Sequence, residues 1–125
     1  YKIMKALMNE DLKDLTEKVY DLISITSVEL GHRTDGKTMA ALAKIFAQDL
    51  MTENRFRRLT FNQIKDAFKI GVRFCEFEPF LNIKTFYRWT ISHKKTISDA
   101  EYQVRTLNKK PEEVPYYQEP LKLLK

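Results

Sequence analysis

The stretch LTFNQIKDAFKIGVRFCEFEPFLNIKTFYRWTISHKK (59–95) constrains the fold of this chain most, because it contains two helix start signals in close succession. Thr60 is a good N-cap, and Gln63 stands three residues later, at the spacing of a capping box. Asn82 is a second N-cap candidate, and apolar residues recur at helical spacing after each cap. The stretch therefore predicts helix, loop, helix, with helices over 61–73 and 83–95.

Two further helices are predicted upstream from apolar periodicity, over 10–24 and 37–52, with the turn-forming segment GHRTDG between them at 31–36. Residues 25–30 fit either a continuation of the first helix or an extended segment. We expect 37–52, 61–73 and 83–95 to form a three-helix unit that the helix at 10–24 packs across.

The end of the last helix has two alternatives. Its apolar face continues in a near-heptad rhythm to Leu107, which favours one long helix. Ser98 and Glu101 repeat the capping-box spacing, which favours a break near Thr96 and a new helix from Asp99. The fold class expected is all-α, with four to five helices in a single domain over 1–107.

The segment 108–125 is expected to be an extended, proline-containing C-terminal arm. Pro111, Pro115 and Pro120 exclude a continuous helix there. Its apolar residues, from Tyr116 to Leu124, suit a peptide that docks on a protein partner. The chain opens on Tyr1, as expected of a fragment or a processed product.

The positive charge of the chain is concentrated around the two central helices. The net charge is +5, and residues 54–110 contain thirteen Lys and Arg against five Asp and Glu. A concentrated positive charge suits a polyanion and steers it on approach. The plain alternative is a solvated basic face with no nucleic-acid role.

A short cationic helix presented by a preceding helix is how helix-turn-helix proteins read a major groove. We therefore expect the exposed face of the helix at 83–95, together with the basic connector before residue 60, to contact nucleic acid, with DNA favoured over RNA. The candidate residues are Lys84, Thr85, Tyr87, Arg88, Ser92, Lys94, Lys95, Arg55, Arg57 and Arg58.

The pair LTFNQIKDAF and NIKTFYRW resembles the two-helix core of helix-turn-helix DNA-binding domains. The resemblance implies base-reading roles for Lys84, Thr85, Tyr87 and Arg88, and packing roles for the residues Ile83, Phe86 and Trp89. The connector of about nine residues departs from the usual turn of three or four residues. More loosely, the chain is similar to small helical replication proteins of bacteriophages and mobile elements, such as replication initiators and helicase loaders.

Aromatic residues are a second candidate for nucleic-acid contact, because exposed rings stack on single-stranded bases. The set comprises Phe74, Phe77, Phe80, Phe86, Tyr87 and Trp89. Aromatics at helical spacing are more often part of the core, and we assign Phe86 and Trp89 to the core on this ground.

Neither a metal site nor an active site is expected, and no cofactor is implied. Cys75, His32 and His93 are far apart and form no paired ligand motif. Glu76 and Glu78 are paired carboxylates in a loop with no sign of a substrate cleft. No glycine-rich phosphate loop occurs.

The sequence also bears on where the protein functions. It contains no apolar run long enough for a membrane span, so no membrane association is expected. A single cysteine cannot form an internal disulfide, which fits an intracellular, reducing, cytoplasmic location.

The leading hypothesis is a non-enzymatic nucleic-acid-binding module of phage or mobile-element replication or regulation. The rival is a helical protein–protein interaction or structural module of a virion or scaffold, whose basic face binds an acidic partner protein.

Overall fold

The structure is a computed structural model that describes residues 5–75 and 79–118. Over these residues it contains four α-helices, two short 3₁₀ helices and no strand beyond an isolated bridge between Ala6 and Thr60. The all-α prediction is therefore confirmed. The elements are η1 (Leu7–Asn9), α1 (Leu12–Glu29), α2 (Gly36–Thr52), α3 (Phe61–Phe74), α4 (Ile83–Arg105) and η2 (Pro111–Glu113).

The first two α-helices begin at aspartate caps. The carboxylate of Asp11 accepts a hydrogen bond from the backbone N–H of Asp14, so α1 begins at Leu12 rather than at residue 10. Asp35 caps α2 in the same way, through the N–H of Thr38. Residues 25–29 continue α1, which settles the alternative that the sequence left open.

The predicted capping box of α3 is present. The Gln63 N–H donates to Thr60 Oγ1 at 3.3 Å, and the Thr60 N–H donates to Gln63 Oε1 at 2.9 Å. Asn82 caps α4 as predicted, with its Oδ1 accepting from the N–H of Thr85 at 2.9 Å. Both helices thus start at the residues that the sequence indicated.

The last α-helix is one long helix, so of the two alternatives the continuous helix is confirmed, whereas the predicted end at residue 95 is too early. Ile97 and Ala100 are buried on the same side of α4 as His93. A continuous helix keeps all three side chains in contact with the protein interior, whereas a break would expose new unpaired backbone groups. Ser98, the candidate cap, is instead an exposed residue within the helix.

Aromatic rings from three helices form the centre of the core. Phe46 of α2 packs on Phe68 of α3 and on Phe86 of α4, with ring centroids 5.8 and 5.3 Å apart. Trp89 meets Phe68 edge-on at 5.3 Å and is only 5% exposed. The expectation that Phe86 and Trp89 belong to the core is therefore confirmed.

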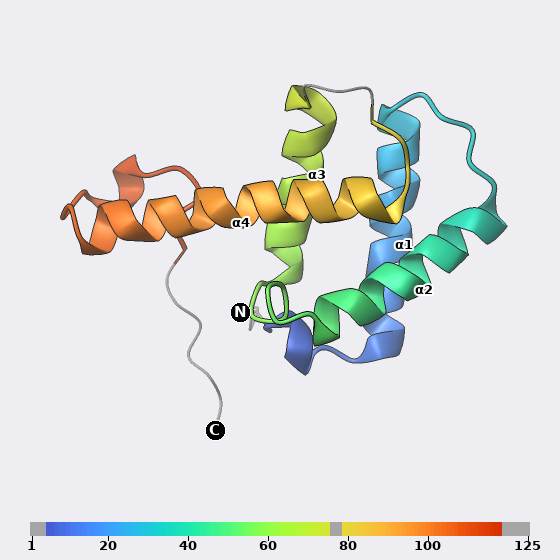
Figure 1. Cartoon of the computed structure of the whole chain (residues 1–125), viewed down its shortest axis with the longest axis horizontal. Helices are drawn as coiled ribbons and strands as arrows, with labels where there is room; N and C mark the ends of the chain where they lie inside the picture. Colours follow the sequence, from blue (N-terminus) through green and yellow to red (C-terminus); the bar gives the residue numbers. More distant parts are fainter. Residues whose placement is uncertain (1–4, 76–78, 119–125) are drawn as a thin grey trace.

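The third and fourth helices cross where Gly71 lies against the indole of Trp89. A Cβ atom on Gly71 would overlap the ring, so the glycine permits the close approach of the two helices. In Figure 1, α4 lies across α3, and its C-terminal half extends beyond the other helices.

The chain after α4 folds back, unlike the extended arm that its prolines predicted. Residues 111–113 form η2, and Val114 is buried. The Tyr116 ring meets the His93 ring edge-on, with centroids 5.1 Å apart. Val114, Tyr116 and Gln118 thus contact the body of the protein, whereas residues 108–113 are exposed. The remainder of the predicted arm and docking peptide, 119–125, lies outside the described residues.

Candidate nucleic-acid interface

The connector between α2 and α3, residues 53–60, holds the predicted basic residues Arg55, Arg57 and Arg58. It is fixed by burial of Phe56, which has no exposed surface, and of Leu59. The N-terminal segment fastens it from the other side, because the N–H of Leu7 donates to the Leu59 carbonyl at 2.8 Å. The arginines therefore project from a rigid segment rather than from a loose loop.

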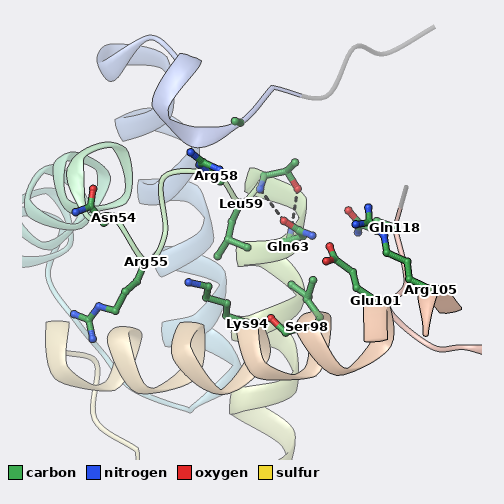
Figure 2. A pocket seen from close by; sticks show the side chains of 13 residues that line it. Asn54, Arg55, Arg58, Leu59, Gln63, Lys94, Ser98, Glu101, Arg105 and Gln118 are labelled. Carbon is green, nitrogen blue, oxygen red and sulfur yellow. Dashed lines mark hydrogen bonds between the residues drawn. The ribbon is translucent and has the colours of Figure 1, made fainter. Parts of the chain in front are cut away.

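This connector and α4 border a cleft of about 410 Å³. Arg55 and Arg58 of the connector and Lys94 of α4 line it, so three residues that the sequence assigned to one interface do meet in space. Figure 2 shows Lys94 and Ser98 rising from α4, with Arg58 on the opposite side. Arg105 lines the cleft as well, although the sequence analysis did not single it out.

The four cations of the cleft are only partly neutralised by protein carboxylates. Arg55 pairs with Glu53, with Nε 3.0 Å from Oε1, and its hydrogen bond is the main reason that the pKa of Glu53 is below its usual range. Within the described part of the chain, Arg58, Lys94 and Arg105 take part in no ion pair. Glu101 is the one carboxylate among the lining residues. The cleft therefore has a positive balance.

The outer face of α4 carries a second group of predicted cations. Lys84, Arg88 and Lys95 are exposed and share one side of the helix at a turn of about 100° per residue. Lys94 and Arg105 stand next to this side, toward the cleft. The five cations thus occupy one arc of about 120° on α4, calculated from the same helical spacing. We call this arc, together with Arg55 and Arg58, the basic face.

Thr85 does not belong to the basic face, so its assignment as a contact residue is wrong. It is 4% exposed and lies one turn before the buried Trp89. Its backbone N–H donates to the Asn82 cap, and its side chain is buried. A buried hydroxyl cannot reach a phosphate or a base edge.

Tyr87 is half-buried, and its hydroxyl is engaged by the protein itself. Its hydroxyl donates a hydrogen bond of 2.7 Å to Asp49 of α2, and its ring packs edge-on against Phe56. Burial, reinforced by this hydrogen bond and by the charge of Asp49, raises the pKa of Tyr87 to about 12. The structure makes Tyr87 a link between α4, α2 and the connector.

The remaining predicted residues lie apart from the cleft. Arg57 is half-buried, and its Nε has no hydrogen-bond partner among the described residues. Ser92 is exposed on the opposite flank of α4, where it lines a groove between α3 and α4 together with Arg88. The candidate set is therefore divided between the basic face, the protein interior and this groove.

The residues considered for base stacking and for catalysis are found as follows. Phe74 and Phe80 are exposed, at 75% and 64%, whereas Phe77 lies outside the described residues, as do Glu76 and Glu78. Within the described ranges, no group of three or more His, Cys, Asp or Glu side chains is arranged to hold a metal ion.

Burial lowers the pKa of His93, although the charge of Asp66 opposes the change. In the part of the chain that the structure describes, no helix has the length and apolar character of a membrane span.

Sequence reasoning missed Arg105, Asn54, Glu101 and Gln118 as cleft residues. For Arg105 a signal was present, because the long-helix alternative places it on the side of α4 that Lys94 occupies. Asn54 and Gln118 had no such signal, since their approach to α4 depends on how the connector and the C-terminal segment fold.

Comparisons of the chain with protein-family models, with curated proteins and with solved structures find no match. The likeness to helix-turn-helix domains therefore remains a prediction from the sequence.

Proposed function

We propose that this protein is a non-enzymatic nucleic-acid-binding module that contacts the phosphate backbone through its basic face. Seven cations form that face: Arg55, Arg58, Lys84, Arg88, Lys94, Lys95 and Arg105. Phosphate contacts from Lys and Arg supply most of the affinity of such proteins and do not depend on sequence.

The observation that supports this proposal most is the convergence of two separate segments. The connector and α4 are distant in sequence, yet Arg58 and Lys94 line one cleft. Five α4 cations fall within one arc of the helix, which concentrates positive potential on the side that a polyanion would approach. Charges that served only to keep the protein surface hydrated would not need to be clustered in this way.

Base reading of the helix-turn-helix kind has less support than backbone binding. Of the four residues that the resemblance assigned to reading, Thr85 is buried and the Tyr87 hydroxyl is bonded to Asp49. Lys84 and Arg88 remain exposed on the N-terminal half of α4. We therefore propose binding of low sequence specificity, as a replication or regulatory module of a phage or mobile element would use.

The test is fluorescence anisotropy of labelled nucleic acids over a salt series. We expect affinity to fall linearly in log salt, with a slope of several phosphates. Replacing the outer-face pair, Lys84→Ala with Lys95→Ala, is expected to reduce that slope by about two. The matched control is Lys13→Ala with Lys44→Ala, which removes the same charge from exposed positions on α1 and α2.

Two outcomes contradict the proposal. One is the absence of binding to any nucleic acid at low salt by a protein whose circular dichroism shows it to be folded. The other is an equal loss of affinity in the control pair, which would mean that net charge alone is responsible. Competition by poly-glutamate at matched charge would favour the rival function, a basic face for an acidic protein partner.

A further inference from the structure

The cleft on the basic face has an apolar floor beneath its cations. Ala6, Leu59 and Ile97 line it and are buried, with exposed fractions of 4 to 9%. Arg58 and Lys94 line the same cleft, and Ser98 follows Lys94 by one turn on α4. A site that only held a phosphate would not need an apolar floor, since a phosphate group has no apolar surface to bury.

The charges of the cleft differ from one end to the other. Figure 2 shows Glu101, Gln118 and Arg105 close together at one end, with Arg58 and Lys94 away from them. At that end the Glu101 carboxylate offsets the charge of Arg105, whereas no lining carboxylate lies with Arg58 and Lys94, so an anionic group is favoured near Arg58 and Lys94. Glu101 and Gln118 can instead accept or donate hydrogen bonds at the edge of a nucleobase.

The size of the cleft favours a flexible single strand over a rigid duplex. A volume of about 410 Å³ falls in the range of pockets that take a small organic ligand, which is the size class of one nucleotide. In a duplex the bases are stacked and paired inside the helix, so no nucleotide can enter a cleft unless it is extruded. A single strand can place one nucleotide there without that cost.

We propose that the cleft receives one nucleotide of a single-stranded nucleic acid, with its phosphate between Arg58 and Lys94 and its base on Leu59 and Ile97. This inference rests on the proposed function, and it adds that the preferred ligand is a single strand. The outer side of α4, with Lys84 and Lys95, then contacts neighbouring phosphates of any nucleic acid.

The test compares three labelled probes of equal length: single-stranded DNA, single-stranded RNA and duplex DNA. We expect the wild-type protein to bind at least one single strand about tenfold or more tightly than the duplex. Ser98→Phe occupies part of the cleft without changing charge, and it should remove most of this preference by lowering single-strand affinity more than duplex affinity. Arg58→Ala with Lys94→Ala should reduce single-strand affinity more than duplex affinity.

The outer-face pair Lys84→Ala with Lys95→Ala is the control, because it should weaken binding of every probe by a similar factor. A thermal melt establishes that each variant is folded. Equal binding of single strands and duplex by the wild-type protein would overturn this inference and leave the proposed function standing. A single-strand preference that survives in both folded cleft variants would also overturn it. No binding of any probe would overturn both.

Discussion

Gly71→Ala is the substitution that tests the crossing of α3 and α4 most directly. Alanine in place of glycine within a helix ordinarily stabilises it by about 0.5–1 kcal/mol. Here the new methyl group would overlap Cγ, Cδ1 and Cδ2 of Trp89. These are ring atoms close to the backbone, so the indole cannot avoid the methyl group by a small rotation of its far end.

The magnitude follows from the surroundings of the indole. Trp89 is bounded by Phe68, with ring centroids 5.3 Å apart, and by Phe86 at 6.4 Å, so relief requires α4 to shift. Overpacking of this kind costs about 1–3 kcal/mol, and we expect the upper end of that range. After the gain in helix propensity, the net loss of stability is about 2 kcal/mol. At about 4 °C per kcal/mol for a chain of this size, the melting temperature should fall by about 8 °C.

The assay is thermal and urea unfolding followed by circular dichroism. Gly36→Ala is the matched control, because its methyl group would meet only the Tyr20 hydroxyl, at an ordinary contact distance of 3.4 Å. Adding Trp89→Leu to Gly71→Ala should make the two losses less than additive, since a smaller side chain leaves room for the methyl group. A Gly71→Ala protein as stable as the wild type would refute the reasoning.

Three further predictions concern the core and its titrating groups. Phe86→Ala should lower the free energy of unfolding by about 3–5 kcal/mol, because the ring has no exposed surface; a loss below 1 kcal/mol in urea titrations would contradict its core role. The pKa of Tyr87 is raised to about 12 in the folded protein against about 10 in the unfolded chain, so its contribution is full below pH 10 and is lost as the pH rises toward 12. The difference in unfolding free energy between wild type and Tyr87→Phe should shrink across that interval, and a constant difference would argue against the part-buried hydrogen bond to Asp49. Burial lowers the pKa of His93, so its contribution is present above pH 6.5 and is lost as the pH falls. Urea unfolding at pH 7.5 and 5.5 should show a smaller loss of stability on acidification in His93→Gln than in wild type or in the control His32→Gln.

The positions of helix starts were determined by local chemistry, and the sequence alone predicted them well. The capping box of Thr60 and Gln63 and the cap at Asn82 involve groups within three residues of each other. Such hydrogen bonds form in the same way whatever the rest of the chain does. The all-α class followed from these caps and from apolar periodicity.

The orientation of side chains on α4 was decided only by tertiary contacts. The periodicity placed Lys84 and Arg88 on the outer side correctly, but Thr85 and Tyr87 lie at the edges of that side. There tertiary packing decides what is buried: Thr85 is enclosed, and the Tyr87 hydroxyl is hydrogen-bonded to Asp49 of α2. The helix also ran past residue 95 because burying Ile97 outweighed the local start signal at Ser98.

The sequence by itself determined the helices, their caps and the concentration of positive charge between residues 54 and 110. Only the tertiary structure decided which of those charges lie side by side. Arg58 and Lys94 meet because Phe56 and Leu59 fasten the connector into the core beside α4. Arg105 joins them because α4 continues for its full length. A cleft between distant segments depends on how buried faces pack, and packing between distant faces leaves no regular spacing along the chain.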